Sequence, residues 1–185
     1  MFADLAGVPS GPENGAVYPP GDLGRSLAET ARLVRADIGT EVVTVDFGAW
    51  DMHFGVGNPE SGLLTTAVQE LALGLKAFFT DLGTLGARVT VVTISEFGRR
   101  VEENANNGLD HGWGNVMLLL GAGVRGGRYH GTWPGLSHGN LVEGDLAVTN
   151  DYRSVLAEVV RTRFGADVSK VFPGFHPRPI GAMAA

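Results

Sequence analysis

Apolar residues recur at helical spacing in two stretches of the first half of the chain. In residues 22–38 they follow one stripe with a period of about 3.6 residues, and Gly39 comes directly after it. Residues 63–82 carry adjacent apolar pairs every three or four positions, with polar residues mostly between them, and Gly83 follows. The pattern predicts two helices that end at these glycines.

A third helix is predicted near the C-terminal end, over about residues 151–164. Asn150 is the expected N-cap because its side chain can accept a hydrogen bond from the first turn. Gly165 is the expected terminating residue, since glycine adopts the left-handed conformation without a steric cost. Arginines in the last turn favour the negative end of the helix dipole.

Three β-branched or apolar runs have the length of strands, and they are residues 41–47, 88–94 and 115–120. The second run is nearly all β-branched, which is typical of a strand that is buried on both faces. The order helix, strand, helix, strand, strand, helix favours βαβ units, with the long helices as crossovers. The expected fold class is therefore α/β, with a largely parallel sheet and flanking helices.

The domain organisation follows from length and from the positions of proline and glycine. With 185 residues, the chain is long enough for one ordinary domain, and no repeat or low-complexity linker divides it. Residues 1–21 are rich in glycine and proline and are expected to form an irregular lead-in. A single α/β domain is expected over residues 22–172, and residues 173–185 are expected to form a tail.

Charge and composition exclude several classes of protein. The net charge of −6, from 14 basic and 20 acidic residues, argues against a nucleic-acid binder. The chain has no cysteine, which excludes disulfides and thiolate metal sites. No run approaches the ~18 apolar residues of a transmembrane helix. Residues 1–20 lack a signal peptide, so the expected location of the chain, taken as complete, is cytoplasmic.

Polar residues with catalytic or metal-binding chemistry cluster beside the three predicted strands: Asp51 and His53, Glu96 and Arg99, and Asp110 and His111. Loops that follow parallel strands converge at one edge of a sheet, where ligands bind. Carboxylate and imidazole are the usual ligands of zinc, and they also suit manganese. An Asp-x-His pair in extended chain points both side chains to one side. Arg99 suits an anionic ester, such as a phosphate or sulfate ester.

Each cluster also has a simpler interpretation. Asp-x-His and Asp-His pairs are common by chance, and a single loop histidine is more often a turn or hydrogen-bonding residue. Asp110 can close the turn begun by residues 106–108, or orient a neighbouring ligand from the second shell. Glu96 can form a surface ion pair with Arg99 or Arg100, which contributes little to stability. The prediction of a metal site rests on the occurrence of several such clusters at successive loops.

Several motifs in the same order resemble the family called domain of unknown function 1501. With the Asp51-Met-His53 segment, the resemblance covers about residues 23–165. That family is similar to the alkaline phosphatase and sulfatase superfamily of three-layer α/β hydrolases, which hold divalent metals. The motifs that carry the resemblance are residues 93–101, 107–112, 121–129 and 149–155.

The resemblance implies a first metal site formed by Asp51, His53 and His111. In the superfamily an adjacent Asp-His pair binds a second metal, and the corresponding place here reads Ser95-Glu96-Phe97. Glu96 can replace the acid of that pair, whereas Phe97 cannot replace the histidine. Asp110 then becomes a residue that orients a ligand.

The resemblance extends only to the C-terminal half of such proteins, whose N-terminal half carries the nucleophile. Full-length relatives often begin with an export signal. The expected function is the metal-binding half of a metal-dependent ester hydrolase, with Glu96 and Arg99 as catalytic candidates. The alternative is a non-catalytic domain that binds a ligand or partner, because the half that carries the nucleophile is missing from the resemblance and Phe97 replaces a metal-binding histidine. A partial sheet would expose apolar surface, so self-association is expected.

Overall fold

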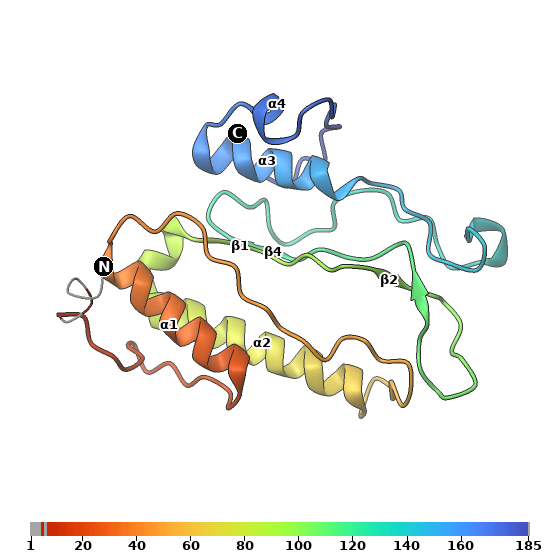
Figure 1. Cartoon of the computed structure of the whole chain (residues 1–185), viewed down its shortest axis with the longest axis horizontal. Helices are drawn as coiled ribbons and strands as arrows, with labels where there is room; N and C mark the ends of the chain where they lie inside the picture. Colours follow the sequence, from red (N-terminus) through yellow and green to blue (C-terminus); the bar gives the residue numbers. More distant parts are fainter. Residues whose placement is uncertain (1–4, 6, 185) are drawn as a thin grey trace. The chain divides into compact units, whose positions relative to one another are not determined.

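The structure is a computed structural model that describes residue 5 and residues 7–184 (Figure 1). Residues 1–4 and 6 of the expected lead-in and residue 185 of the expected tail lie outside the described residues. The chain forms two compact units. The N-terminal unit extends to Ala87 and includes Asn104–Gly108, and the C-terminal unit contains Arg88–Glu103 and the chain from Leu109 onward.

The described elements are short, apart from three helices. Their bounds are α1 (Asp22–Ala36), α2 (Leu63–Leu82), η1 (Gly83–Arg88), β1 (Thr90–Val92), β2 (Gly98–Arg99), β3 (His111–Gly112), β4 (Leu119–Gly121), η2 (His138–Asn140), α3 (Tyr152–Phe164) and α4 (Val168–Val171).

The N-terminal unit is built on α1 and α2, which pack side by side (Figure 1). Gly74 of α2 allows this close approach, because a Cβ there would lie 3.0 Å from Cδ1 of Leu27 and 3.4 Å from Cδ2 of Leu23. Both predicted helices are confirmed. The first ends at Ala36, with Asp37 in the left-handed conformation at its C-cap, slightly before the predicted end.

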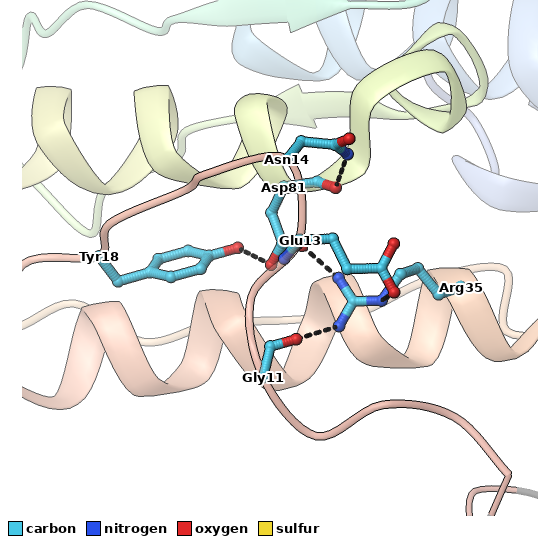
Figure 2. Close-up of polar contacts among 6 residues, drawn as sticks. All are labelled: Gly11, Glu13, Asn14, Tyr18, Arg35 and Asp81. Carbon is cyan, nitrogen blue, oxygen red and sulfur yellow. Dashed lines mark hydrogen bonds and ion pairs between the residues drawn. The ribbon is translucent and has the colours of Figure 1, made fainter.

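A buried carboxylate joins the lead-in to both helices of this unit. Asp81 of α2 accepts hydrogen bonds from the Glu13 amide and the Tyr18 hydroxyl, both 2.8 Å long (Figure 2). It also forms an ion pair with Arg35 of α1, and its backbone carbonyl accepts a 2.8 Å bond from Asn14. The three partners of the carboxylate, Glu13, Tyr18 and Arg35, compensate the cost of burying the charge of Asp81.

The C-terminal unit contains two small antiparallel sheets. In the first, β1 pairs with β4, and Val91 lies opposite Leu120. In the second, β2 pairs with β3, and Arg99 lies opposite His111. The chain between β1 and β4 passes through β2 and β3 and contains no α-helix. The chain therefore returns to β1 in the antiparallel direction after forming the β2–β3 pair within the connection.

The expected α/β fold with a largely parallel sheet is therefore wrong. All strands in the described part of the chain belong to the two antiparallel pairs, and the three-layer architecture implied by the alkaline phosphatase resemblance does not appear there. The run 41–47 has the composition of a strand but forms no described ladder, and Val42 and Val43 are exposed. A β-branched run becomes a strand only when a partner strand satisfies its backbone.

The third predicted helix is confirmed as α3, with one correction at its start. The N-cap is Asp151, whose carboxylate accepts a 2.8 Å hydrogen bond from the Arg153 amide, and not Asn150. The helix ends at Gly165 in the left-handed conformation, as predicted. The side-chain hydrogen bond from Arg153 is the main cause that lowers the pKa of Asp151.

The C-terminal segment packs on α3 through one carboxylate. Glu158 accepts hydrogen bonds, 2.6–3.2 Å long, from four successive backbone amides of residues 180–183. Burial alone would raise the pKa of Glu158, but these four amides stabilise the anion and lower it. Ala182 and Met183 are buried, so the end of the expected tail is an ordered part of the unit.

Candidate metal site

Asp51 and His53 meet at the surface of the N-terminal unit. An Asp51 Oδ1 atom lies 3.0 Å from His53 Nε2, and the two side chains are 58% and 43% exposed. Met52 between them is buried. The Met52 amide donates a 3.1 Å hydrogen bond to the Trp50 carbonyl, so the chain makes a tight turn at Asp51, and the side chains on either side of Met52 are partly exposed. The Asp-x-His spacing thus produces one exposed oxygen and nitrogen pair.

A separate loop of the chain holds the segment that follows His53. The Gly55 amide donates a 3.1 Å hydrogen bond to the Asn106 carbonyl, and the Val56 amide donates a 2.8 Å bond to the Asn107 carbonyl. We call residues 104–108 the Asn104 loop. Although it is distant in sequence, this loop forms part of the N-terminal unit.

His111 is fixed by its neighbours in the C-terminal unit. It lies in β3 opposite Arg99 of β2, and its imidazole stacks on the Phe97 ring with centres 3.8 Å apart and planes 15° from parallel. The Arg99 guanidinium carbon lies 4.8 Å from the centre of the same ring. The Arg99 side chain also donates a hydrogen bond to the Leu109 carbonyl. The ring and the strand pairing together limit the rotation of the His111 side chain.

Asp51, His53 and His111 form a group that could hold a metal ion, and we call it the Asp–His group. Each residue offers one ligand atom, and these atoms lie within 4.8 Å of one another. A carboxylate oxygen and two imidazole nitrogens are a ligand set of catalytic zinc sites and also suit manganese. Three protein ligands leave a coordination position for water or for a ligand. The donor chemistry therefore fits a divalent cation.

The other predicted site residues do not belong to the Asp–His group among the described residues. Glu96 is exposed, and Asp110 is half-buried, with its carbonyl accepting a 2.9 Å bond from the Arg100 amide. Arg100 does not depend on Glu96 for an ion pair, because it lies 3.5 Å from a carboxylate oxygen of Asp145. Arg99 is the member of the set that lies beside His111.

Two residues that support the site were missed by the sequence analysis. Phe97 was interpreted only as the loss of a second metal ligand, yet it is the surface on which His111 stacks. Asn104, which precedes the predicted turn at residues 106–108, donates a 3.0 Å hydrogen bond to the His53 carbonyl. Neither role has a local signal in the sequence, because each depends on a contact between residues that are distant along the chain.

The chain combines helices with two small antiparallel sheets, and it carries a candidate metal site in the Asp–His group. Residues 11–182 match the family described as "Protein of unknown function (DUF1501)", and the chain belongs to this family. No curated protein matches the chain, and no solved structure matches it. None of the helices among the described residues has both the length and the apolar character needed to cross a membrane.

Proposed function

We propose that the chain binds a divalent metal ion, zinc or manganese, through Asp51, His53 and His111. The observation that carries this proposal is the approach of their three ligand atoms to within 4.8 Å. The direct contact of Asp51 with His53 supports it, because that pair already holds an oxygen and a nitrogen ligand together.

Chain connectivity also supports the inclusion of His111. Gly108 packs on the backbone of His53, since an added Cβ would overlap the His53 carbonyl. His111 follows only three residues later, and three extended residues span at most about 11 Å. His111 is therefore tethered close to His53 by the chain itself. This argument needs only the contact at Gly108 and the length of the peptide.

The proposed activity at this site is hydrolysis of a phosphate or sulfate ester, as in the alkaline phosphatase and sulfatase superfamily. A bound ion supplies Lewis acidity toward an ester oxygen. Arg99 lies opposite His111 in the β2–β3 pair and offers a guanidinium to the anionic group. Glu96 is exposed in the segment that leads into β2 and is the candidate for proton transfer.

The exposure of the ligands favours a second candidate, a domain that binds metal and an anion without turnover. Asp51 and His53 are each about half exposed. Electrostatic stabilisation of a transition state is strongest where water is excluded, and such exposure weakens it. A screen of generic phosphate and sulfate esters with added zinc or manganese separates the two candidates. Turnover that Asp51→Asn abolishes supports the hydrolase and excludes binding alone.

Metal binding itself is tested by elemental analysis and calorimetric titration of the full chain. We expect one zinc or manganese ion per chain, lost in both His53→Ala and His111→Ala. The control is His138→Ala, because that side chain is 92% exposed and lies outside the Asp–His group. Protein that takes up no metal, with a melting temperature unaffected by chelator, would overturn the proposal. So would equal loss of metal in the control.

We also propose that the chain self-associates. Several apolar side chains of α2 are more than two-fifths exposed, namely Leu63, Leu64, Val68 and Leu73. Exposed apolar surface of this kind favours association. Light scattering at increasing concentration tests the proposal, with Val68→Lys expected to shift the chain toward monomer. A strictly monomeric wild-type chain at high concentration contradicts it.

A further inference from the structure

The Asn104 loop is closed by its own hydrogen bonds. The Asn104 side-chain oxygen accepts the amides of Asn106 and Gly108 at 2.9 and 3.0 Å. The backbone amide of Asn104 donates a 2.8 Å hydrogen bond to the backbone carbonyl of Gly108, and the backbone amide of Asn107 donates a 3.1 Å bond to the backbone carbonyl of Asn104. Asn107 adopts a left-handed conformation with φ of 53°, which asparagine tolerates better than most residues. One side chain therefore organises the whole loop.

The same side chain joins the loop to a metal-ligand candidate. While its oxygen holds the loop, the Asn104 side-chain nitrogen donates a 3.0 Å hydrogen bond to the His53 carbonyl. The backbone bonds of the loop to Gly55 and Val56 continue this junction along the chain. Asn104 thus uses its acceptor toward the loop and its donor toward His53. Asparagine has both functions at one carbon, and aspartate lacks the donor.

Gly108 brings the loop against His53 without any clearance. It is buried, and a Cβ at this position would overlap the carbonyl carbon and oxygen of His53 and the Phe54 amide. Only a hydrogen atom fits between the two backbones. Asn104 at the start of the loop bonds to the His53 carbonyl, and Gly108 at its end packs against the same carbonyl. Both ends of the loop therefore hold Gly108 in place relative to His53.

We infer that the Asn104 loop sets the spacing of His53 and His111, with Asn104 as a positioning residue for metal binding. This inference rests on the proposed metal site. The loop fixes Gly108 on His53, and a short spacer of Leu109 and Asp110 then leads to His111. At the far end of this spacer, the Arg100 amide donates a 2.9 Å bond to the Asp110 carbonyl.

The closing experiment compares Asn104→Asp with Asn58→Asp in the full chain. Asn104→Asp keeps the size and the acceptor oxygen but removes the donation to His53. Asn58 is the matched control, because its side-chain oxygen accepts the amides of Glu60 and Ser61 at 3.0 and 2.8 Å. Its side-chain nitrogen makes no described hydrogen bond, so Asn58→Asp adds the same charge to the same unit without removing a donor.

Zinc affinity is measured by calorimetry, the coordination of cobalt by its visible spectrum, and the melting temperature on metal-free protein. We expect Asn104→Asp to weaken zinc binding about tenfold or more, the usual effect of removing a residue that orients a ligand. The cobalt spectrum should change as well. Asn58→Asp should bind zinc within about twofold of wild type.

A second variant keeps the test informative if Asn104→Asp does not fold. A glycine inserted between Leu109 and Asp110 leaves every bond of the Asn104 loop in place and lengthens only the spacer. We expect it to weaken zinc binding while the melting temperature of the metal-free protein changes little. Unchanged zinc affinity in this variant would overturn the inference about spacing.

The outcomes for the two proposals are distinguishable. If wild-type protein binds no zinc or cobalt, the metal site and the positioning role both fail. If wild type binds metal and Asn104→Asp binds it equally well, the positioning role alone fails. If Asn58→Asp weakens binding as much as Asn104→Asp, the effect is one of charge, and the positioning role is again overturned.

Discussion

The imidazole of His111 lies face to face with the phenyl ring of Phe97, with their centres 3.8 Å apart. Phe97 directly precedes β2 and His111 is the first residue of β3, and Arg99, which pairs with His111, also lies over the Phe97 ring. Stacked rings of this kind add to the burial energy of the pair. Phe97 is therefore part of the support of His111.

This contact leads to a prediction for Phe97→Leu. Leucine keeps much of the apolar volume but offers no ring face, so the His111 side chain gains rotational freedom. We expect zinc affinity to fall several-fold, toward the roughly tenfold loss typical of residues that orient a ligand. Calorimetry gives the affinity, and Phe164→Leu on the half-exposed end of α3 serves as the control. Equal affinities in all three proteins would contradict the supporting role.

The ion pair of Asp81 and Arg35 should be essential for the stability of the N-terminal unit. The Asp81 side chain is fully buried, and that of Arg35 is 7% exposed. Asp81→Asn removes the buried anion beside Arg35 and leaves the partly exposed Glu13 carboxylate, 3.5 Å away, as an ionic partner. We expect a loss of about 3 kcal/mol in the free energy of unfolding. Urea denaturation measures this loss.

The control for that substitution is Asp22→Asn, which removes the ion pair with Arg25. Both of those side chains are mostly exposed, and an exposed pair contributes under about 1 kcal/mol. Similar losses in the two variants would show that the burial of Asp81 has no special cost, contrary to the geometry in Figure 2.

Tyr18 should make stability depend on alkaline pH. Burial raises the pKa of Tyr18, and the hydrogen bond to the Asp81 carboxylate raises it further. Because the folded state holds this proton more tightly, the stabilisation is fully present below the unfolded value of 10.0 and is lost as the pH rises toward the folded pKa. Urea denaturation at increasing alkaline pH should show a decline that is smaller in Tyr18→Phe. A decline of the same size in both proteins would assign it to other groups.

Glu158 should control the order of the C-terminal segment. In Glu158→Gln, one accepting oxygen becomes a donor that faces backbone amides, so residues 180–183 should exchange hydrogen faster. The lowered pKa of Glu158 has a second consequence. The protection of residues 180–183 from exchange is fully present above the ordinary Glu pKa of 4.5 and is lost as the pH falls through the folded pKa. Hydrogen exchange by mass spectrometry measures both effects. Glu60→Gln, on an exposed turn, should leave the exchange of this segment unchanged.

The sequence predicted those parts of the fold that depend on local pattern. The three long helices were predicted because their apolar spacing and terminating glycines are local signals. The sheet was not, because the run 41–47 has strand composition whether or not a partner exists. The N-cap moved from Asn150 to Asp151, since both residues suit that position and only the backbone decides.

The sequence predicted the residues of the candidate site but not the backbone arrangement that brings them together. Asp51 and His53 were expected to share a side of an extended chain, and they do lie 3.0 Å apart, but the chain makes a tight turn at Asp51. His111 was expected near them at the edge of a parallel sheet, yet it lies in an antiparallel pair and is tethered to His53 through the Asn104 loop. Contacts between distant segments decide such arrangements, and one sequence does not reveal them.

The Asn104 loop also makes the two units interleaved in the chain. The polypeptide passes between them at Ala87–Arg88, returns at Glu103–Asn104 and leaves again at Gly108–Leu109. A gene split at the first of these junctions would place the loop on the second fragment, although its hydrogen-bonding partners lie on the first. The two fragments should therefore associate when they are expressed together. Copurification of the untagged fragment with the tagged one would reveal this association.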